Sequence, residues 1–173
     1  MTRTQRAYTA SGSIVVNTAP STAYEQVSSP ALMGRWSPEN LGATVRDAQQ
    51  PSFVGMTFDG HNKRGAFRWT TRCTVTAAEP GERFAFRVHA IGLKRPFLRG
   101  PIATWEYRFE SAGAGTKVTE TWTDDRRSWP DFVANTFDRI ATRGHTFASF
   151  QHRNIQTTLR NLKSALEETS KTP

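Results

Sequence analysis

One cysteine, Cys73, stands among the 173 residues of the chain. A single cysteine excludes an intramolecular disulfide framework and is typical of a reducing compartment, so we expect a cytoplasmic protein. Uninterrupted apolar runs cover only a few residues, which is too short for a transmembrane helix. Residues 1–13 contain no apolar segment of the secretory type, so we expect no signal peptide.

Familiar site motifs are absent as well. The sequence contains no G-x-S-x-G elbow, no phosphate-binding loop and no G-x-G-x-x-G fingerprint. His145 and His152 are seven residues apart on an expected helix, about 10 Å along its axis, which is too far for one zinc ion. We therefore expect no metal site and no cofactor. We expect Cys73 to be a small core residue rather than a nucleophile.

Acidic residues are scarce in one part of the chain. Ten basic and three acidic side chains lie between residues 61 and 108, whereas the rest of the chain carries 13 and 12. A localised positive field attracts nucleic acid, anionic lipid or an acidic ligand, although such a run is also usual for a solvated face. No helix-turn-helix, zinc-finger or RNP-type motif accompanies the charge, so nucleic acid is the weakest of these interpretations.

Aromatic residues are plentiful, with five Trp and eleven Phe, so a packed core is expected. Most of them fall in segments with a period of two, which indicates half-buried antiparallel strands. The strand segments, counting a short apolar run at the start, are residues 12–17, 55–62, 67–75, 84–89, 104–109 and 116–124. Two short helices are expected after the first of them, at residues 21–28 and 31–36.

After residue 126 the apolar period becomes helical. Ser128 and Asp131 resemble a capping box, and an apolar stripe with steps of three or four follows from Val133 to Leu166. This helix must bury its stripe against the sheet. We therefore predict an α+β fold: a curved antiparallel sheet of about six or seven strands wrapped around one long C-terminal helix. The length indicates a single domain over residues 10–168, with flexible termini at 1–9 and 169–173.

Short motifs accompany this order of elements. They are Ala19-Pro20, the run from Met33 to Pro38, the glycine-spaced segment from Gly55 to Gly65, Trp69-x-x-x-Cys73-x-Val75, the turn segment from Glu79 to Phe86, and the strand start from Gly115 to Glu120. With these motifs the chain resembles the START-like (SRPBCC) superfamily, in its polyketide cyclase/dehydrase branch. The resemblance covers roughly residues 10–168.

The resemblance implies the helix-grip fold with a deep apolar cavity between sheet and helix. Members of the superfamily bind lipids, sterols or aromatic polyketides. Others cyclise or dehydrate polyketides, serve as co-chaperones or associate with ribosomes. No catalytic motif is common to all of them, so the resemblance assigns a fold and leaves the activity open.

The inner face of the sheet is expected to be aromatic, and the helix presents small or polar residues to it. Such surfaces either interdigitate as an ordinary core or leave a ligand-sized space. Gly144 is equally compatible with a kink of the helix, and Asn62 with turn chemistry instead of a contact at the cavity rim. The residues expected to bind a ligand are Trp36, Phe58, Asn62, Trp69, Phe84, Phe86, Trp105, Tyr107, Trp122, Phe137, Gly144 and Ala148.

Glu120 is the candidate catalytic residue. Alternation places it between Val118 and Trp122, on the inner face of a strand. A buried carboxylate needs a partner or takes up a proton, and a raised pKa would make it a general acid or base. Tyr107 or Asn62 would then orient the substrate. A bulge or an edge position that returns Glu120 to solvent, or an ion pair with an inward arginine, is the alternative.

The segment 91–101 mixes basic and apolar side chains and contains glycine and proline, which predicts an irregular loop. Lys94, Arg95 and Arg99 are its candidate anion or membrane contacts. Leu93 and Phe97 beside them suit a lid that touches an anionic membrane or an amphipathic ligand. Alternatively, the apolar residues fold back over the cavity mouth.

Three functions remain open on the sequence alone. The first is the binding of a hydrophobic small molecule, such as a lipid, a fatty acyl chain or a polyketide, inside the cavity. The second is a cyclase or dehydratase in which Glu120 shuttles protons. The third is a protein-interaction module that uses the basic face of the sheet, where Arg68, Arg72 and Arg87 point outward.

Overall fold

Seven antiparallel strands form one sheet in the order β1-β7-β6-β5-β4-β3-β2. The computed structural model describes residues 7–46, 51–130, 142 and 147–169. Neighbouring strands of the sheet are consecutive in the chain except β1 and β7. Their antiparallel pairing joins the first strand of the chain to the last. The elements are β1 (Thr9–Val16), α1 (Pro20–Val27), the 3-10 helix η1 (Pro30–Arg35), β2 (Asn40–Val45), β3 (Thr57–Arg64), β4 (Phe67–Glu79), β5 (Arg83–Gly92), β6 (Leu98–Ala112), β7 (Gly115–Asp124) and α3 (Phe147–Thr169).

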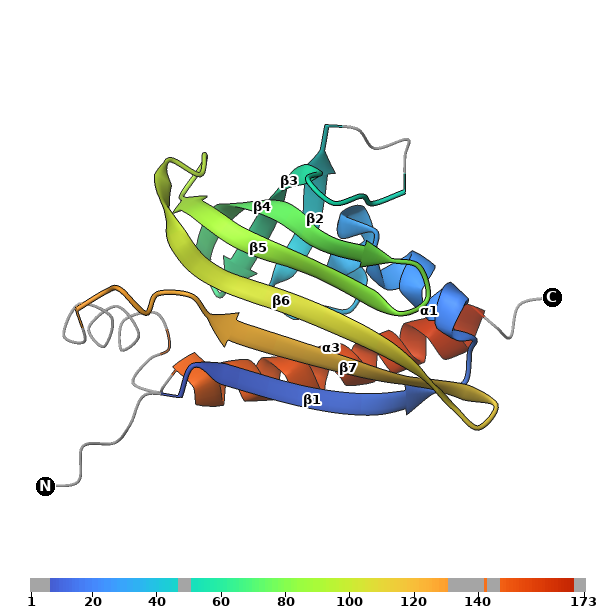
Figure 1. Ribbon diagram of the computed structural model, residues 1–173. Helices are drawn as coiled ribbons and strands as arrows, with labels where there is room; N and C mark the ends of the chain where they lie inside the picture. Colours follow the sequence, from blue (N-terminus) through green and yellow to red (C-terminus); the bar gives the residue numbers. More distant parts are fainter. Residues whose placement is uncertain (1–6, 47–50, 131–141, 143–146, 170–173) are drawn as a thin grey trace, which may run out of the picture.

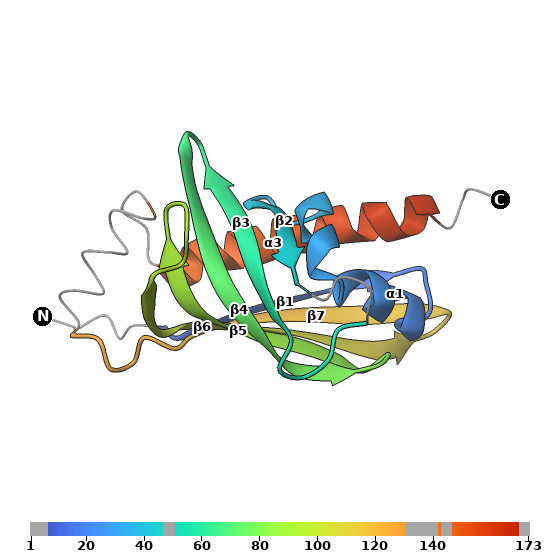
Figure 2. The ribbon, with the colours of Figure 1, turned by 90° about the horizontal axis from the view of Figure 1, so that it is seen from above.

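The sheet curves around α3, which runs along β1 and β7 on the concave side (Figures 1 and 2). Sheet and helix approach each other closely at Gly12, where an added Cβ would stand 3.0 Å from Cγ2 of Ile155. The absence of a side chain at this β1 position lets the helix lie directly on the strand. The α+β helix-grip arrangement predicted from the sequence is confirmed.

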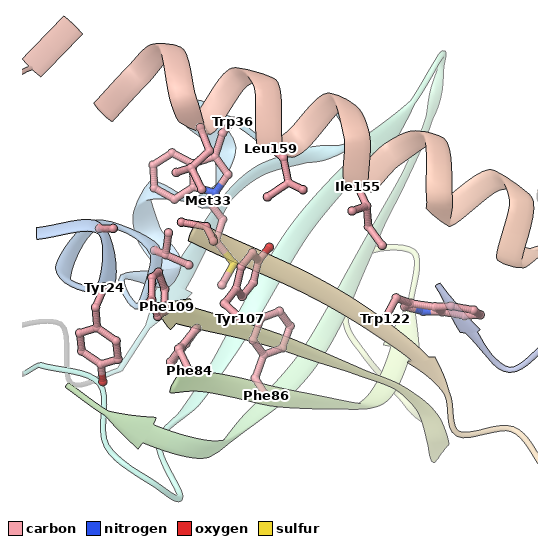
Figure 3. Close-up of a cluster of buried hydrophobic side chains, with 14 of the residues drawn as sticks. Tyr24, Met33, Trp36, Phe84, Phe86, Tyr107, Phe109, Trp122, Ile155 and Leu159 are labelled. Atoms are coloured by element: carbon pink, nitrogen blue, oxygen red, sulfur yellow. The ribbon is translucent and has the colours of Figure 1, made fainter. Parts of the chain in front are cut away.

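The core lies between the concave face, α3 and the two short helices (Figure 3). Pro20 occupies the first turn of α1, where its missing N–H is harmless, and Tyr24 and Val27 turn inward one helical turn apart. Trp36 follows η1 and Trp122 lies on β7, and each is only 1% exposed. Trp36 packs beside the short helices, whereas Trp122 lies on the side away from them and stacks on Phe147 of α3 (Figure 3).

Two strand assignments from the sequence need correction. Strand β2 was missed, because Gly42 and the polar residues around it give no clear alternation. Strand β6 begins at Leu98 rather than at residue 104, so most of the supposed loop 91–101 belongs to two paired strands. Ile91 pairs with Leu98, and the register between β5 and β6 shifts between Val88 and Ala90. The irregular backbone that glycine and proline predicted is therefore confined to this shift and to the turn. Only residues 93–97 form the turn.

Candidate functional site

A cavity of about 370 Å³ lies between the concave face of the sheet and α3. One end is closed by Met33 and Trp36 beside η1, and the other reaches the β5–β6 turn, where Leu98 and Arg99 are exposed. The aromatic side chains of its wall are Trp36, Phe58, Trp69, Phe86, Trp105, Tyr107, Trp122, Trp129 and Phe147.

Most of the expected ligand-binding residues line this cavity, and Asn62 is among them. Asn62 is held there by hydrogen bonds with the side chains of Asn40 and Thr71. Two expected residues do not line it. Phe84 is fully buried in the core, where its ring packs against Phe86, and Ala148 is half-buried on α3. Residues 137 and 144, the predicted Phe137 and Gly144 contacts, lie outside the described residues, as do the capping residue Asp131 and the start of the stripe at Val133.

Glu120 is buried, 2% exposed, and lines the cavity. Tyr107, its register partner on β6, donates a hydrogen bond from its hydroxyl to Oε1 of Glu120 at 2.8 Å. Burial raises the pKa of Glu120 to about 8, and the Tyr107 hydrogen bond lowers it only in part. The carboxyl is therefore protonated at pH 7. Burial, followed by the proximity of Glu120, raises the pKa of Tyr107 well above its usual value, so the phenol stays neutral as well.

Gln151 projects from α3 into the same cavity and is 6% exposed. Its Oε1 and the Oε2 of Glu120 are the two buried side-chain oxygens without a hydrogen-bond partner among the described residues. Native proteins rarely leave such atoms unpaired. The apolar stripe of the sequence signals Gln151 as a polar residue at a position that should be bulky, which is how sequence reasoning could have found it.

A buried ion pair, which the sequence did not reveal, lies at the end of β7. Arg126 donates from Nε and a terminal nitrogen to the two carboxylate oxygens of Asp124, at 2.9 and 2.8 Å. The side chains are 3% and 1% exposed. The Arg126 guanidinium also lies 4.9 Å from the ring centroid of Phe147. A planar guanidinium pairs with a carboxylate in this bidentate way and stacks on an aromatic face at the same time.

Polar groups from β3, α3 and the segment before β2 gather at one side of the cavity. Arg64 forms an ion pair with Glu39, and Asn154 donates a hydrogen bond to the same carboxylate at 3.0 Å. The Arg64 guanidinium stacks 4.0 Å from the ring centroid of Phe150. This cluster links the β3 end of the sheet to the helix and gives the cavity a polar flank.

Unpaired positive charge is concentrated at two neighbouring hairpin tips. The outward Arg72 and Arg87 form ion pairs with Asp59 and Asp125, so part of the basic sheet face is neutralised. The basic residues of segment 61–108 without an ion pair among the described residues are Lys63, Arg68, Lys94, Arg95 and Arg99, at the β3–β4 and β5–β6 turns. The two turns lie together because Thr70 pairs with Gly92.

Large apolar side chains are exposed at the same two tips. Phe67 is 58% exposed, Leu93 62%, Phe97 69% and Leu98 59%. We call these four residues, with the five basic residues named above, the tip surface. The sequence predicted its β5–β6 half through Lys94 and Arg95, but the contribution of Phe67 depends on strand pairing and was not foreseen.

Metal and thiol chemistry find no support in the described part of the chain. No group of three His, Cys, Asp or Glu side chains within it could hold a metal ion. Cys73 is buried, and burial raises the pKa of its thiol to about 12, so the reactive thiolate does not form near neutral pH. None of the described helices combines the length and the apolar character that crossing a membrane demands.

Comparison with protein families gives one match, to polyketide cyclase / dehydrase and lipid transport proteins, over residues 8–167. The chain belongs to this family. The sequence motifs therefore identified the superfamily correctly, and the matched region contains every element of the cavity. None of the curated proteins compared with this family member matches it.

Solved structures share the fold of this family member at low sequence identity. A polyketide-cyclase-like protein from Corynebacterium glutamicum, solved by NMR, is 24% identical over 95% of this chain and 97% of its own, with a TM-score of 0.58. A Chromobacterium violaceum protein is 13% identical over 93% and 99%, with a TM-score of 0.63. DynU16, a protein of the dynemicin biosynthetic locus, is 15% identical over 93% of this chain and 48% of its own, with a TM-score of 0.59. At these identities the likeness establishes the fold alone.

Proposed function

We propose that the protein binds a predominantly apolar small molecule, such as a lipid, a fatty acyl chain or a polyketide-like compound, inside the cavity between the sheet and α3. The observation that carries the proposal is the cavity itself, about 370 Å³ and walled by aromatic rings. Ligand sites typically occupy roughly 300–1,000 Å³ and combine an apolar wall with a few polar groups. Burial of an apolar ligand contributes about 25 cal/mol for each Å² removed from water.

A cavity-filling variant tests this function. Val88 is buried and lines the cavity, so Val88→Phe places a ring in the space that the ligand needs. Val15→Phe is the matched control, because Val15 is 50% exposed and does not line the cavity. Fluorescent fatty-acid and aromatic probes should bind the wild type and Val15→Phe equally, and Val88→Phe at least about tenfold more weakly. Equal binding by all three proteins would show that the probes bind elsewhere.

A cyclase or dehydratase activity is the second candidate function, and the environment of Glu120 favours it. A protonated carboxyl with a pKa near 8, beside a neutral phenol and facing the cavity, is suited to deliver or accept a proton at neutral pH. Glu120→Gln keeps the size and the hydrogen bonding of the side chain but cannot transfer a proton. It should retain probe binding and abolish turnover of a polyketide substrate. Turnover at the wild-type rate would remove Glu120 from the chemistry.

The tip surface is proposed to dock on an anionic membrane. It combines exposed apolar side chains with basic residues that have no acidic partner among the described residues, a pairing that suits lipid headgroups and the acyl boundary beneath them. It also lies at the end of the cavity that Leu98 and Arg99 line. A docked protein would therefore present this end of the cavity to the membrane, where an apolar ligand can transfer without crossing water.

Vesicle sedimentation tests the docking. Lys94→Glu/Arg95→Glu should bind vesicles with 30% phosphatidylserine about tenfold or more weakly than the wild type, since each basic residue near such a surface contributes about 1 kcal/mol. Val54→Ser is the control, because Val54 is 63% exposed in the segment before β3, at the opposite end of that strand. Equal sedimentation of the charge-reversed variant and the wild type would contradict the proposal.

A further inference from the structure

Two oxygens inside the cavity have no hydrogen-bond partner among the described residues, namely Oε2 of Glu120 and Oε1 of Gln151. Both side chains line the cavity, and the two residues are 2% and 6% exposed. An unsatisfied polar atom at such a depth costs about 1–3 kcal/mol. Because both residues line the cavity, a molecule bound there can satisfy these oxygens.

Contacts on either side place the two side chains opposite each other. Trp122, two residues beyond Glu120 on the same face of β7, stacks on Phe147 of α3 with ring centroids 5.7 Å apart. The β1 residue paired in register with Glu120 is a glycine that lies against Ile155. Gln151 is one helical turn from Phe147 and one from Ile155, so it lies on the stretch of α3 between these two contacts, which faces the Glu120 region of the sheet.

The two free oxygens have complementary roles. Oε1 of Glu120 accepts the hydrogen bond from Tyr107, so the proton of the neutral carboxyl is on Oε2, which can donate it to a ligand. Oε1 of Gln151 is an amide oxygen and can only accept. We infer that the cavity binds its apolar ligand through a hydroxyl group that accepts from Glu120 and donates to Gln151. This inference rests on the proposed binding function and names its ligand class: a neutral alcohol or phenol.

Ketones, esters, ethers, ionised carboxylates and ammonium groups each meet only half of this requirement. A ketone, an ester or an ether accepts hydrogen bonds but has no hydrogen for Gln151. An ionised carboxylate has the same defect, and an ammonium group cannot accept from Glu120. A hydroxyl both donates and accepts, and its short reach keeps the rest of the ligand against the aromatic wall. A trapped water molecule also satisfies both oxygens, so the test must separate water from a ligand hydroxyl.

The test compares two probes of nearly equal shape, 2-naphthalenemethanol and 2-ethylnaphthalene, which differ in a hydroxyl against a methyl group. The measured quantity is the ratio of their dissociation constants, alcohol over hydrocarbon, from calorimetry or tryptophan quenching. Gln151→Met removes the acceptor at similar volume and should raise the ratio about fivefold or more. Thr158→Val is the matched control, a buried polar residue of α3 that also lines the cavity.

Each outcome decides between the claims. A higher ratio in Gln151→Met, with the wild-type ratio in Thr158→Val, supports the hydroxyl site. The same ratio in Gln151→Met and the wild type overturns it and leaves binding in the cavity intact, as expected if water satisfies the two oxygens. An equal rise in Thr158→Val also overturns it, because any loss of polarity would then suffice. If neither probe binds the wild type, this inference is wrong, and the fatty-acid probes then decide the proposed binding function separately.

Discussion

At the scale of single residues, burial determines which carboxyl groups of the protein are ionised. Glu120 keeps its proton at neutral pH because a charged carboxylate would be desolvated, and Tyr107 does not provide the positive charge that would compensate. Asp124 is buried to a similar depth but has Arg126 beside it, and both of its carboxylate oxygens accept hydrogen bonds from the guanidinium. The same fold thus holds one carboxyl ready for proton transfer or ligand binding and another as a fixed structural ion.

The pKa of Glu120 predicts a pH dependence of stability. In the unfolded chain Glu120 loses its proton near pH 4.5, whereas in the folded protein it loses it near pH 8. Between these values the folded state binds one more proton, so this residue's contribution to stability is fully present below pH 4.5 and is lost as the pH rises to 8. Urea denaturation at pH 5, 6.5 and 8 should show Glu120→Gln gaining stability relative to the wild type with each step. A constant difference would contradict a buried protonated carboxyl.

The ion pair of Asp124 and Arg126 predicts a different response. Arg126→Met leaves the carboxylate buried without its guanidinium, which should lower the free energy of unfolding by about 3–5 kcal/mol. The double variant Asp124→Leu/Arg126→Met leaves no charge behind and should be more stable than Arg126→Met. Chemical denaturation measures both. A double variant less stable than the single one would show that the residues act independently.

At the scale of secondary-structure elements, the sequence predicted what alternation and helical period determine. The regular run from Val118 to Trp122 identified the inward side of β7, and the apolar stripe identified the face of α3. Strand β2 and the start of β6 were not predicted, because their pairing partners rather than their own residues stabilise them. The Asp124–Arg126 pair and the exposed position of Phe67 also depend on the turn geometry at strand ends, which no periodicity encodes.

The contact between β1 and α3 gives a prediction at this scale. Gly12→Ala places a methyl group 3.0 Å from Cγ2 of Ile155, so the helix must shift and stability should fall by about 1–3 kcal/mol. Ile155→Leu removes the branch at Cβ and should restore part of the loss when combined with Gly12→Ala. Thermal denaturation of the two single variants and the double variant checks this. Additive losses would place the clash elsewhere.

At the scale of the whole molecule, one architecture explains the separate observations. The curved sheet closes around α3 at β1 and β7 but leaves space under β3 to β6, where aromatic rings and the pair of Glu120 and Gln151 line the cavity. Two hairpin tips extend past that space and carry the five basic residues of the tip surface, which have no ion pair among the described residues. The sequence predicted the grip fold and much of the aromatic wall. It could not predict that the rings leave a cavity rather than a filled core, since that depends on packing at the level of individual side chains.

Native mass spectrometry of the purified protein, followed by solvent extraction and identification of what is released, decides whether this cavity holds an apolar molecule. We expect a small molecule bound to the wild type and to Val15→Phe, and none bound to Val88→Phe. A ligand-free mass for the wild type, together with failure of fatty-acid and aromatic probes to bind it, would contradict the claim and leave the cavity without a function in ligand binding.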